Sequence, residues 1–504
     1  MGSGNRHVEV EKKFDVPAGT VFPSFEGLAT VARVERQPVQ SLDAVYFDTP
    51  GRDLATHRIT LRRRTGGPDA GWHLKLPAGP DARTEVHSPL DTSPEASDTA
   101  VPEELHDIVL AVVRDRLLAP VARIATSRDV VMLYSGDGAA LAEFCDDEVS
   151  AWALDPGDGN AGEQQRWHEW ELELVDSELD GGRDLLKRLG NRLLDAGAVP
   201  AGHGSKLAKV LDTAGSLPEA PAETPVSKDP VHRAVAEQVQ EMLVWDRAVR
   251  ADTYDSVHQM RVTTRKIRSL LQASEEAFGL TDDAWILDEL RQLAGVLGVA
   301  RDAEVLAERY EEALKTLPAE LVRGPVYERL VEGAKQSYQS GLRRSLKAMR
   351  SPRYFRLLDA LEELVAAPPG LAAPGEEPKP VSIDSAYKRV AKAARNAAEA
   401  TEDRDEALHR IRKGAKRLRY VAAATGEPKV SDRAKTIQTL LGDHQDSTVS
   451  RAHLLQQSQV AHAAGEDTFT YGLLYQQEDD LANRCREQLD DALSALRKTF
   501  KKAH

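Results

Sequence analysis

The chain contains 504 residues, of which 41% are hydrophobic and 29% are charged, and its formal net charge is −15. This length is typical of two to four domains, and the acidic balance argues against a general nucleic-acid-binding protein. No apolar run reaches the roughly 18 residues of a membrane-spanning helix, so we expect no membrane partner. The two distant cysteines, Cys145 and Cys485, indicate neither a disulfide framework nor a zinc site, which makes a reducing cytoplasm the expected compartment.

Proline-rich stretches divide the chain into regions of different character. Residues 1–213 alternate short period-two segments with turn formers, which predicts strands and a few helices. Several prolines in 214–230 predict a stiff linker, and the helical periodicity of 231–504 predicts an all-α region. A second proline-rich stretch divides that region into halves of about 231–367 and 381–504. The predicted fold class is therefore α+β.

Charged residues occupy every second position of several predicted strands. Because alternate residues of a strand share one face, Glu9, Glu11 and Lys13 lie together. The same alternation occurs at Arg62 and Arg64, at His73 and Lys75, at Arg83 and Glu85, and at Glu169, Glu171 and Glu173. One interpretation is an antiparallel sheet with a solvated face. The other is a closed barrel with a charged interior, where carboxylates hold Mg²⁺ and cations hold phosphate.

The order of these segments resembles the CYTH, or triphosphate tunnel metalloenzyme, superfamily. Glu9-Val-Glu11-Lys-Lys13 is similar to its ExExK signature, and the later similar segments are Tyr46–Pro50, Leu61–Arg64, Trp72–Pro77, Arg128, 143–147 and 169–174. The resemblance covers about residues 5–210. It implies an eight-stranded antiparallel β-tunnel with flanking helices that binds a triphosphate together with Mg²⁺ or Mn²⁺.

The resemblance also implies roles for single residues. The implied metal ligands are Glu9, Glu11, Asp147, Glu171 and Glu173. The implied substrate-binding residues are Lys13, Arg62, Arg64, Lys75, Arg128 and Lys206. The catalytic set is Glu9, Glu11, Lys13 and Lys75, where Lys75 would act as a base only if its surroundings lowered its pKa. Two points stay open: whether Asp146 or Asp147 faces inward, and whether Arg123 takes the place of Arg128, which we favour.

Two segments of the helical region repeat one pattern. A histidine is followed by basic residues three, seven, eight and ten positions later, first from His258 and again from His409. Leu297-Gly298 and Leu441-Gly442 follow at similar distances, so we expect a duplicated module in which each half is a helical bundle. On a helix these bases share one face, where like charges repel. A basic surface paired with distant acids is one interpretation, and the repetition favours the other, an anion site.

The paired segments resemble the CHAD family of histidine-containing α-helical domains, over about residues 231–504. This resemblance implies two pseudo-symmetric four-helix bundles that enclose a basic channel, and it implies that the channel binds inorganic polyphosphate. The residues to which it points are His258, Arg261, Arg265, Lys266, Arg268, His409, Arg412, Lys413, Lys416, Arg417 and Arg419.

The sequence thus predicts a Mg²⁺- or Mn²⁺-dependent triphosphatase, with inorganic triphosphate as the favoured substrate and polyphosphate as a partner. We expect no nucleic-acid partner, and a cytoplasmic location associated with polyphosphate granules. A polyphosphate-binding protein with little catalysis is the first alternative. Thiamine triphosphatase and adenylate cyclase activities of the tunnel are the others.

Overall fold

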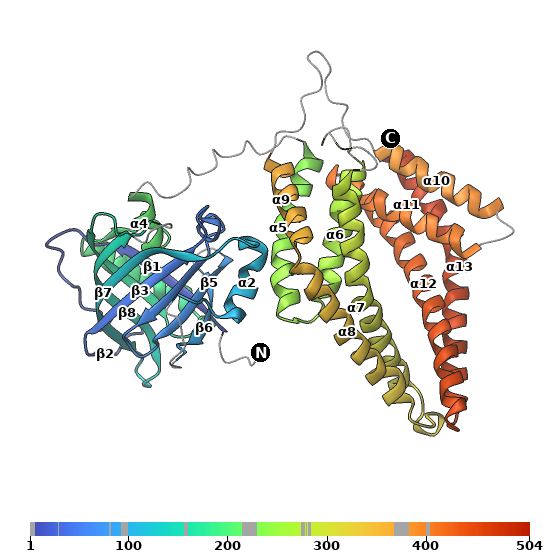
Figure 1. Cartoon of the computed structure of the whole chain (residues 1–504), viewed down its shortest axis with the longest axis horizontal. Helices are drawn as coiled ribbons and strands as arrows, with labels where there is room; N and C mark the ends of the chain where they lie inside the picture. The colour runs from blue at the N-terminus through green and yellow to red at the C-terminus, as the bar shows by residue number, and fades with distance from the viewer. Residues whose placement is uncertain are drawn as a thin grey trace, which may run out of the picture. The chain divides into compact units, whose positions relative to one another are not determined.

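The computed structural model forms two compact units, Met1–Glu223 and Thr224–His504 (Figure 1). The residues that it describes are 6–28, 30–79, 82–91, 99–155, 160–213, 229–273, 278, 280, 284–366, 383–399 and 404–503. The predicted linker lies outside the described residues except for Asp229 and Pro230, and so does the proline-rich stretch between the two predicted helical halves. Asp229 caps the first helix of the second unit by accepting hydrogen bonds from two backbone N–H groups.

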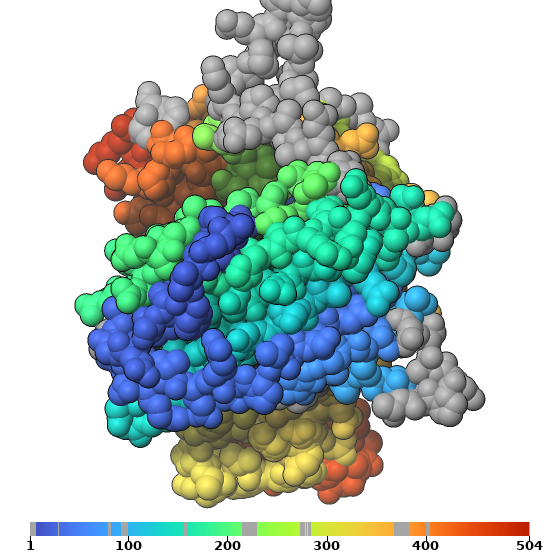
Figure 2. Space-filling model, turned by 90° about the vertical axis from the view of Figure 1, so that its left-hand side faces the viewer, coloured from blue at the N-terminus to red at the C-terminus, as the bar shows by residue number. Residues whose placement is uncertain are grey.

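The first unit is a closed antiparallel barrel. Its strands are β1 (Arg6–Asp15), β2 (Arg33–Arg36), β3 (Gln40–Asp48), β4 (Thr60–Thr65), β5 (Gly71–Gly79), β6 (Ala82–Pro89), β7 (Ala119–Tyr134), β8 (Ala140–Ala153), β9 (Gln165–Leu174) and β10 (Val199–Pro200). Eight of them pair in the order β1-β6-β5-β4-β3-β7-β8-β9, and β9 pairs with β1 to close the ring. Figure 2 faces this barrel and shows the blue N-terminal strands beside the blue-green later ones. The predicted eight-stranded barrel is confirmed.

Apolar side chains on the outer face of the barrel pack against a helix. Val10 and Phe14 of β1 lie in one buried cluster with Leu186, Leu189 and Leu193 of α3 (Gly182–Asp195). These strand residues alternate with Glu9, Glu11 and Lys13, so burial of the apolar face turns the charged face inward. The interpretation as a solvated sheet face is therefore wrong for these strands.

The described part of the first unit contains three further helices: α1 (Asp53–Thr56), α2 (Glu103–Val113) and α4 (Lys206–Thr213). The buried carboxylate of Asp48 accepts hydrogen bonds from the backbone N–H groups of Thr49, Leu54 and Ala55 at 2.7–3.0 Å, which holds the β3–α1 turn. The Tyr-Phe-Asp-Thr-Pro segment therefore contains a structural aspartate. The apolar side chains of α4 pack against inner-face residues of β3, β7 and β8.

The second unit consists of helices. They are α5 (Pro230–Arg250), α6 (Ser256–Ala273), α7 (Trp285–Thr316), η3 (Ala319–Leu321), η4 (Glu328–Glu332), α8 (Gly333–Met349), α9 (Pro352–Ala366), α10 (Ile383–Glu399), α11 (Arg404–Ala424), α12 (Pro428–Ala463) and α13 (Phe469–Ala503). The two repeated segments lie on α6 and α11, which contact each other. In the first half, α8 ends at Met349 and α9 begins at Pro352. The helix is interrupted there because proline has no backbone N–H to continue the hydrogen-bond ladder.

Close packing of α7 and α8 depends on a glycine. A Cβ on Gly341 would lie 2.7 Å from the backbone N and Cα of Ala300. We expect Gly341→Ala to destabilise the helical unit by about 1–3 kcal/mol, because the two helices must separate. Gly295→Ala on α7 is the matched control, since a Cβ there meets nothing within 4 Å and the change favours helix formation. Urea unfolding followed by circular dichroism measures both variants, and equal effects would contradict this packing argument.

Candidate functional site

Carboxylates from three neighbouring strands line one side of the barrel interior. Glu11 pairs with Glu173 and Lys13 pairs with Glu171 between β1 and β9. Directly opposed residues of an antiparallel ladder point to the same face, so all four side chains point inward. Asp147 of β8 lies on the same face and is fully buried.

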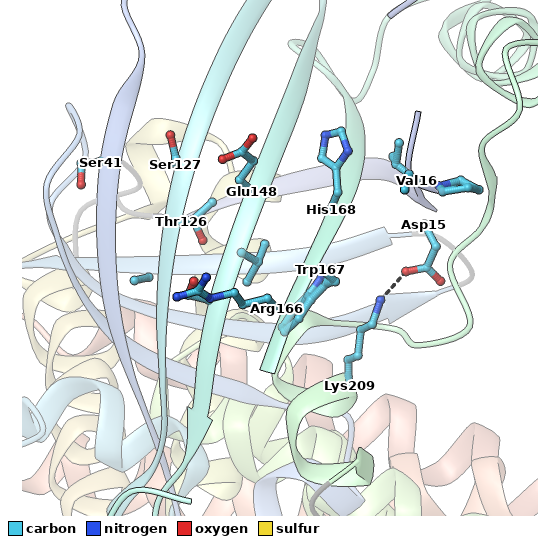
Figure 3. A pocket seen from close by; sticks show the side chains of 15 residues that line it. Asp15, Val16, Ser41, Thr126, Ser127, Glu148, Arg166, Trp167, His168 and Lys209 are labelled. Atoms are coloured by element: carbon cyan, nitrogen blue, oxygen red, sulfur yellow. Dashed lines mark hydrogen bonds and ion pairs between the residues drawn. The ribbon is translucent and has the colours of Figure 1, made fainter. Parts of the chain in front are cut away.

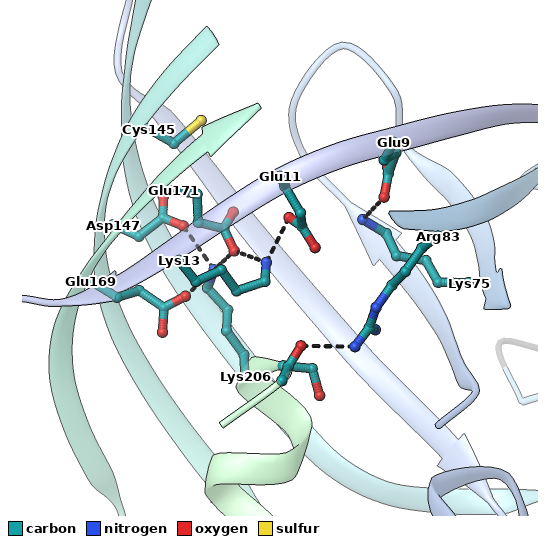
Figure 4. Close-up of polar contacts among 12 residues, drawn as sticks. Glu9, Glu11, Lys13, Lys75, Arg83, Cys145, Asp147, Glu169, Glu171 and Lys206 are labelled. Atoms are coloured by element: carbon teal, nitrogen blue, oxygen red, sulfur yellow. Dashed lines mark hydrogen bonds and ion pairs between the residues drawn. The ribbon is translucent and has the colours of Figure 1, made fainter. Parts of the chain in front are cut away.

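Lysine side chains connect these carboxylates, as Figure 4 shows, and Arg128 of β7 also contacts them. Lys13 Nζ lies 2.7 Å from Glu11 Oε2 and also contacts Glu171. Arg128 donates to both oxygens of Asp147, at 2.8 and 2.6 Å, and to Glu171 at 2.5 Å. Burial opposes ionisation of Glu171, but Lys13, Lys206 and Arg128 outweigh it and hold its pKa well below the ordinary value.

Lys206, at the start of α4, reaches into the same group. Its ammonium nitrogen lies 2.9 Å from Asp147 Oδ2, 2.7 Å from Glu169 Oε1 and 2.9 Å from Glu171 Oε1. Glu169 is a site residue that the sequence-based ligand set omitted, although it is the first of the three alternating glutamates. The placement of Lys206 itself agrees with its predicted position in the tunnel.

Lys75 of β5 lies among carboxylates on the opposite side of β1. Its Nζ is 2.6 Å from Glu9 Oε2 and 3.5 Å from Glu85 Oε2. Burial opposes its protonated form, yet Glu11, Glu85 and Glu9 raise its pKa above the ordinary value. Lys75 therefore stays a cation, and the condition under which it would act as a base is not met. Glu85, which also contacts His73, is a second residue that the predicted set omitted.

Arginines of β4 supply positive charge that carboxylates only partly offset. Arg62 donates to the Tyr46 hydroxyl at 3.4 Å, and this is its one hydrogen-bond partner among the described residues. The Nε atoms of Arg62 and Arg64 are buried and lack a hydrogen-bond partner in the described part of the chain. Arg64 pairs with Asp69, whose side chain is largely exposed. Buried cations with free donors of this kind favour an anionic ligand.

Two glutamates of the tunnel have pKa values well above the ordinary range of a carboxyl group. Burial raises the pKa of Glu9 to about 8, and burial together with Glu11 and Glu171 raises that of Glu173 to about 7 against the opposing charge of Lys75. In contrast, Lys13 and Lys75 overcome the burial of Glu11 and lower its pKa. The carboxylates along β1 and β9 thus differ in charge before any ligand binds.

The donor set fits a hard divalent cation. Among the residues that the structure describes, two groups could hold a metal ion: His7–Glu9–Glu173 and Asp147–Glu169–Glu171. Within each group the ligand atoms lie within 4.8 Å of one another. Both contain carboxylate oxygens, which suit Mg²⁺ and Mn²⁺. Four of the five predicted ligands belong to these groups, and Glu11 lies beside them in contact with Lys13.

The structure also decides the two open positions. Asp146 points to the outer face, where it pairs with His168, whereas Asp147 points inward to Arg128. Arg123 lies outside and pairs with Asp43, with its side chain 55% exposed. Arg128 is therefore the arginine of β7 that lines the tunnel.

One described pocket lies at the tunnel mouth and another lies outside the tunnel. The mouth pocket has a volume of about 900 Å³ and is lined by Glu11, Lys13, Arg83, His203 and Ser205, among others. The outer pocket, of about 910 Å³, is drawn in Figure 3. There Ser41, Ser127, Glu148 and His168 project from adjacent strands on the face opposite Asp147, so this pocket contains no predicted site residue.

The helical unit gathers basic residues between α6 and α11. Gly298 and Gly442 occupy equivalent places in the repeat, and a Cβ on either would lie 3.2–3.3 Å from the guanidinium of Arg261 or Arg412, respectively. The Leu-Gly pairs therefore leave room for one arginine in each half. Burial and the positive charge of Arg261 and Arg412 lower the pKa of Arg265 to about 10. These arginines thus repel one another inside the unit.

The other predicted polyphosphate-binding residues differ in their surroundings. His258 and His409 are partly buried, and burial lowers the pKa of each. Arg268 donates a hydrogen bond to the backbone carbonyl of Leu287, Arg417 to that of Gln272, and Arg419 to the side-chain oxygen of Gln438. Lys266 is half-buried, and Lys413 is exposed. The structure therefore brings Arg261, Arg265, Arg412 and Lys416 together and leaves Lys413 at the surface.

Lys416 is the most perturbed member of this cluster. Burial and the charges of Arg265, Arg412 and Arg261 lower its pKa to about 6. An unfolded lysine keeps its proton to about pH 10, so unfolding takes up a proton between these values and stability rises with pH. We expect Lys416→Met to stabilise the helical unit at pH 7 by about 2 kcal/mol and less at pH 9. Chemical denaturation at both pH values tests this, with exposed Lys413→Met as the control. An equal gain at pH 7 and pH 9 would contradict it.

Comparison with known proteins assigns both units. A CYTH domain model matches residues 7–190 and a CHAD domain model matches residues 233–455. The chain therefore belongs to the proteins in which a CYTH domain is fused to a CHAD domain. It is 64% identical over 511 residues to the uncharacterized protein Rv2226 of Mycobacterium tuberculosis (strain ATCC 25618 / H37Rv), covering 99% of this chain and 98% of that protein.

Solved structures with more distant similarity match about half of the chain or less. PptA from Streptomyces chartreusis is 21% identical, with a TM-score of 0.44, and the match covers 53% of this chain and 98% of that one. The putative adenylyl cyclase HpAC1 from Hippeastrum, described as having a dominant triphosphatase activity, is 15% identical with a TM-score of 0.27, over 42% of this chain and 98% of that one. Within the described residues, no helix has both the length and the hydropathy that a membrane span requires.

Proposed function

We propose that the barrel hydrolyses a triphosphate, with inorganic triphosphate as the preferred substrate, and that it requires Mg²⁺ or Mn²⁺. The supporting observation is the division of its interior. Carboxylates of β1, β8 and β9 are close enough together to hold a cation, and Arg62 and Arg64 offer buried donors for phosphate oxygens. A linear triphosphate with bound metal complements both.

The residues of the chain have distinct roles in this proposal. Glu9, Glu171, Glu173, Asp147 and Glu169 would hold the metal, which supplies Lewis-acid stabilisation of phosphoryl charge when bound. Arg62, Arg64 and Arg128 bind and orient the phosphate oxygens, and cationic Lys75 and Lys13 offset the charge of the leaving pyrophosphate. A water molecule attacks the terminal phosphorus, and its proton passes to solvent or phosphate because Lys75 is already protonated.

For the helical unit we propose binding of inorganic polyphosphate. Arg261, Arg265 and Arg412 repel one another in a partly buried cluster, and their charge lowers the pKa of the neighbouring Lys416. A bound polyanion would relieve this repulsion and favour the protonated form of Lys416. Such binding would hold the enzyme near polyphosphate granules in the cytoplasm. The alternative of a polyphosphate-binding protein without catalysis predicts this binding but no phosphate release.

A cyclase function has less support. The tunnel walls near Arg62 and Lys75 carry the polar side chains of His73 and Glu85 rather than an apolar slot for a nucleobase. The deciding experiment is a panel of triphosphate, long-chain polyphosphate, thiamine triphosphate and ATP, each with and without Mg²⁺ and Mn²⁺. We expect metal-dependent phosphate release that is fastest with triphosphate. Cyclic AMP from ATP as the main product, or no release from any substrate, would overturn the proposal.

A further inference from the structure

The ammonium of Lys206 lies at the position that suits a metal ion. It is within 2.9 Å of one oxygen each from Asp147, Glu169 and Glu171, and its side chain is 9% exposed. The same three carboxylates have oxygens close enough together to hold one ion. A Mg²⁺ ion requires oxygens at about 2.1 Å, so it would occupy nearly the same point as this nitrogen. The lysine and the ion therefore exclude each other.

The movement that would free the site is small. α4 is anchored by Leu207, Val210 and Leu211, which pack against the inner face of the barrel. Its backbone can stay in place while the four-carbon side chain of Lys206 turns toward a phosphate oxygen. The same lysine can thus pair either with the three carboxylates or with a bound anion.

We propose that Lys206 is a built-in competitor of the metal at the Asp147–Glu169–Glu171 group, and that a polyanionic substrate removes this competition by drawing the ammonium to itself. This inference rests on the proposed function of the barrel. It makes metal and substrate binding mutually dependent at this group, and thermodynamic linkage requires the coupling to be reciprocal. The His7–Glu9–Glu173 group differs, because Lys75 contacts only Glu9 among its members.

Mn²⁺ binding to the full chain, freed of metal by chelator, tests this inference without any activity measurement. Electron paramagnetic resonance of free Mn²⁺ is recorded with and without a non-hydrolysable imido analogue of triphosphate. In the wild type, the analogue should tighten one class of Mn²⁺ site roughly tenfold to a hundredfold. Lys206→Met should show that tight class without the analogue and lose most of the coupling.

Lys209→Met is the matched control, because Lys209 lies on the same helix and pairs with Asp15 instead. It should behave like the wild type. If Lys206→Met binds Mn²⁺ no more tightly than Lys209→Met in the absence of the analogue, the proposal is wrong. Should Lys206→Met fold only when Mn²⁺ is present, that requirement supports the proposal. If Lys206→Met does not fold at any Mn²⁺ concentration, the Mn²⁺ affinity of Lys206→Gln is compared with that of Lys209→Met instead, and equal affinities would again contradict the proposal. This test measures Mn²⁺ binding, and the proposed function is tested by phosphate release, so the two can fail separately. If the analogue tightens Mn²⁺ binding to a wild-type protein that hydrolyses no triphosphate, the proposed function is wrong and the competition by Lys206 is still supported.

Discussion

Glu171→Gln is expected to lower metal-dependent triphosphate hydrolysis by roughly a thousandfold. Glu171 lies at the centre of the carboxylate side of the tunnel, where it contacts Lys13, Arg128 and Lys206. The substitution removes a negative charge from a proposed metal group and leaves three cations facing a neutral amide. Initial rates of phosphate release at saturating Mg²⁺ measure the effect.

The matched control is Glu148→Gln, which lies on the outer face of neighbouring β8. It should retain the wild-type rate, because its side chain does not line the tunnel. Isothermal titration with Mn²⁺ should show weakened metal binding for Glu171→Gln alone. A wild-type rate in a folded Glu171→Gln protein would exclude this tunnel as the active site.

The largest effect on polyanion binding is expected from charge reversal of Arg265 and Lys416. Together, Arg265→Glu and Lys416→Glu turn two bases of the α6–α11 cluster into acids, and we expect polyphosphate affinity to fall about a hundredfold or more at low salt. The slope of log affinity against log salt concentration should become less steep by roughly 1.4, the change expected when two contacts to the phosphates of a single-stranded polyanion are lost. Filter binding of labelled polyphosphate over a salt series measures both quantities.

Arg410→Glu controls for net charge, because Arg410 is exposed on α11 and pairs with Glu406. It should reduce affinity only slightly. Triphosphate hydrolysis should be unaffected in both proteins, because neither change touches the barrel. Unchanged polyphosphate binding by the double variant would show that the anion site lies elsewhere.

The period-two alternation predicted which residues face the tunnel, since burial of Val10 and Phe14 forces Glu9, Glu11 and Lys13 inward. It could not predict which charged residues meet, because those contacts depend on strand order and register. The convergence of Lys206 with Asp147 and Glu169 joins three separate elements, and no local pattern indicates it. Glu169 could have been found, because it alternates with Glu171 and Glu173 on one strand.

In the helical unit, the repeat predicted two equivalent basic faces, and α6 and α11 carry them. The sequence did not predict that Lys413 stays at the surface while Lys416 is buried, because neighbouring bases on a helix differ only through tertiary packing. The role of the Leu-Gly pairs was also hidden, since it consists of space for Arg261 and Arg412 across the helix interface.

Closure of the barrel through β1 and β9 has a consequence for how the protein is made. The first half of β1 can pair with β6 early, but Glu11 and Lys13 obtain their partners Glu173 and Glu171 only when residues 169–173 have left the ribosome. The charged interior therefore cannot close while the chain is short. Until then Glu9, Glu11 and Lys13 remain in water, where their charges cost little. Pairing between strands so far apart in the sequence is slow, because a long loop must be closed first. The barrel and its charged site are therefore completed together, late in folding.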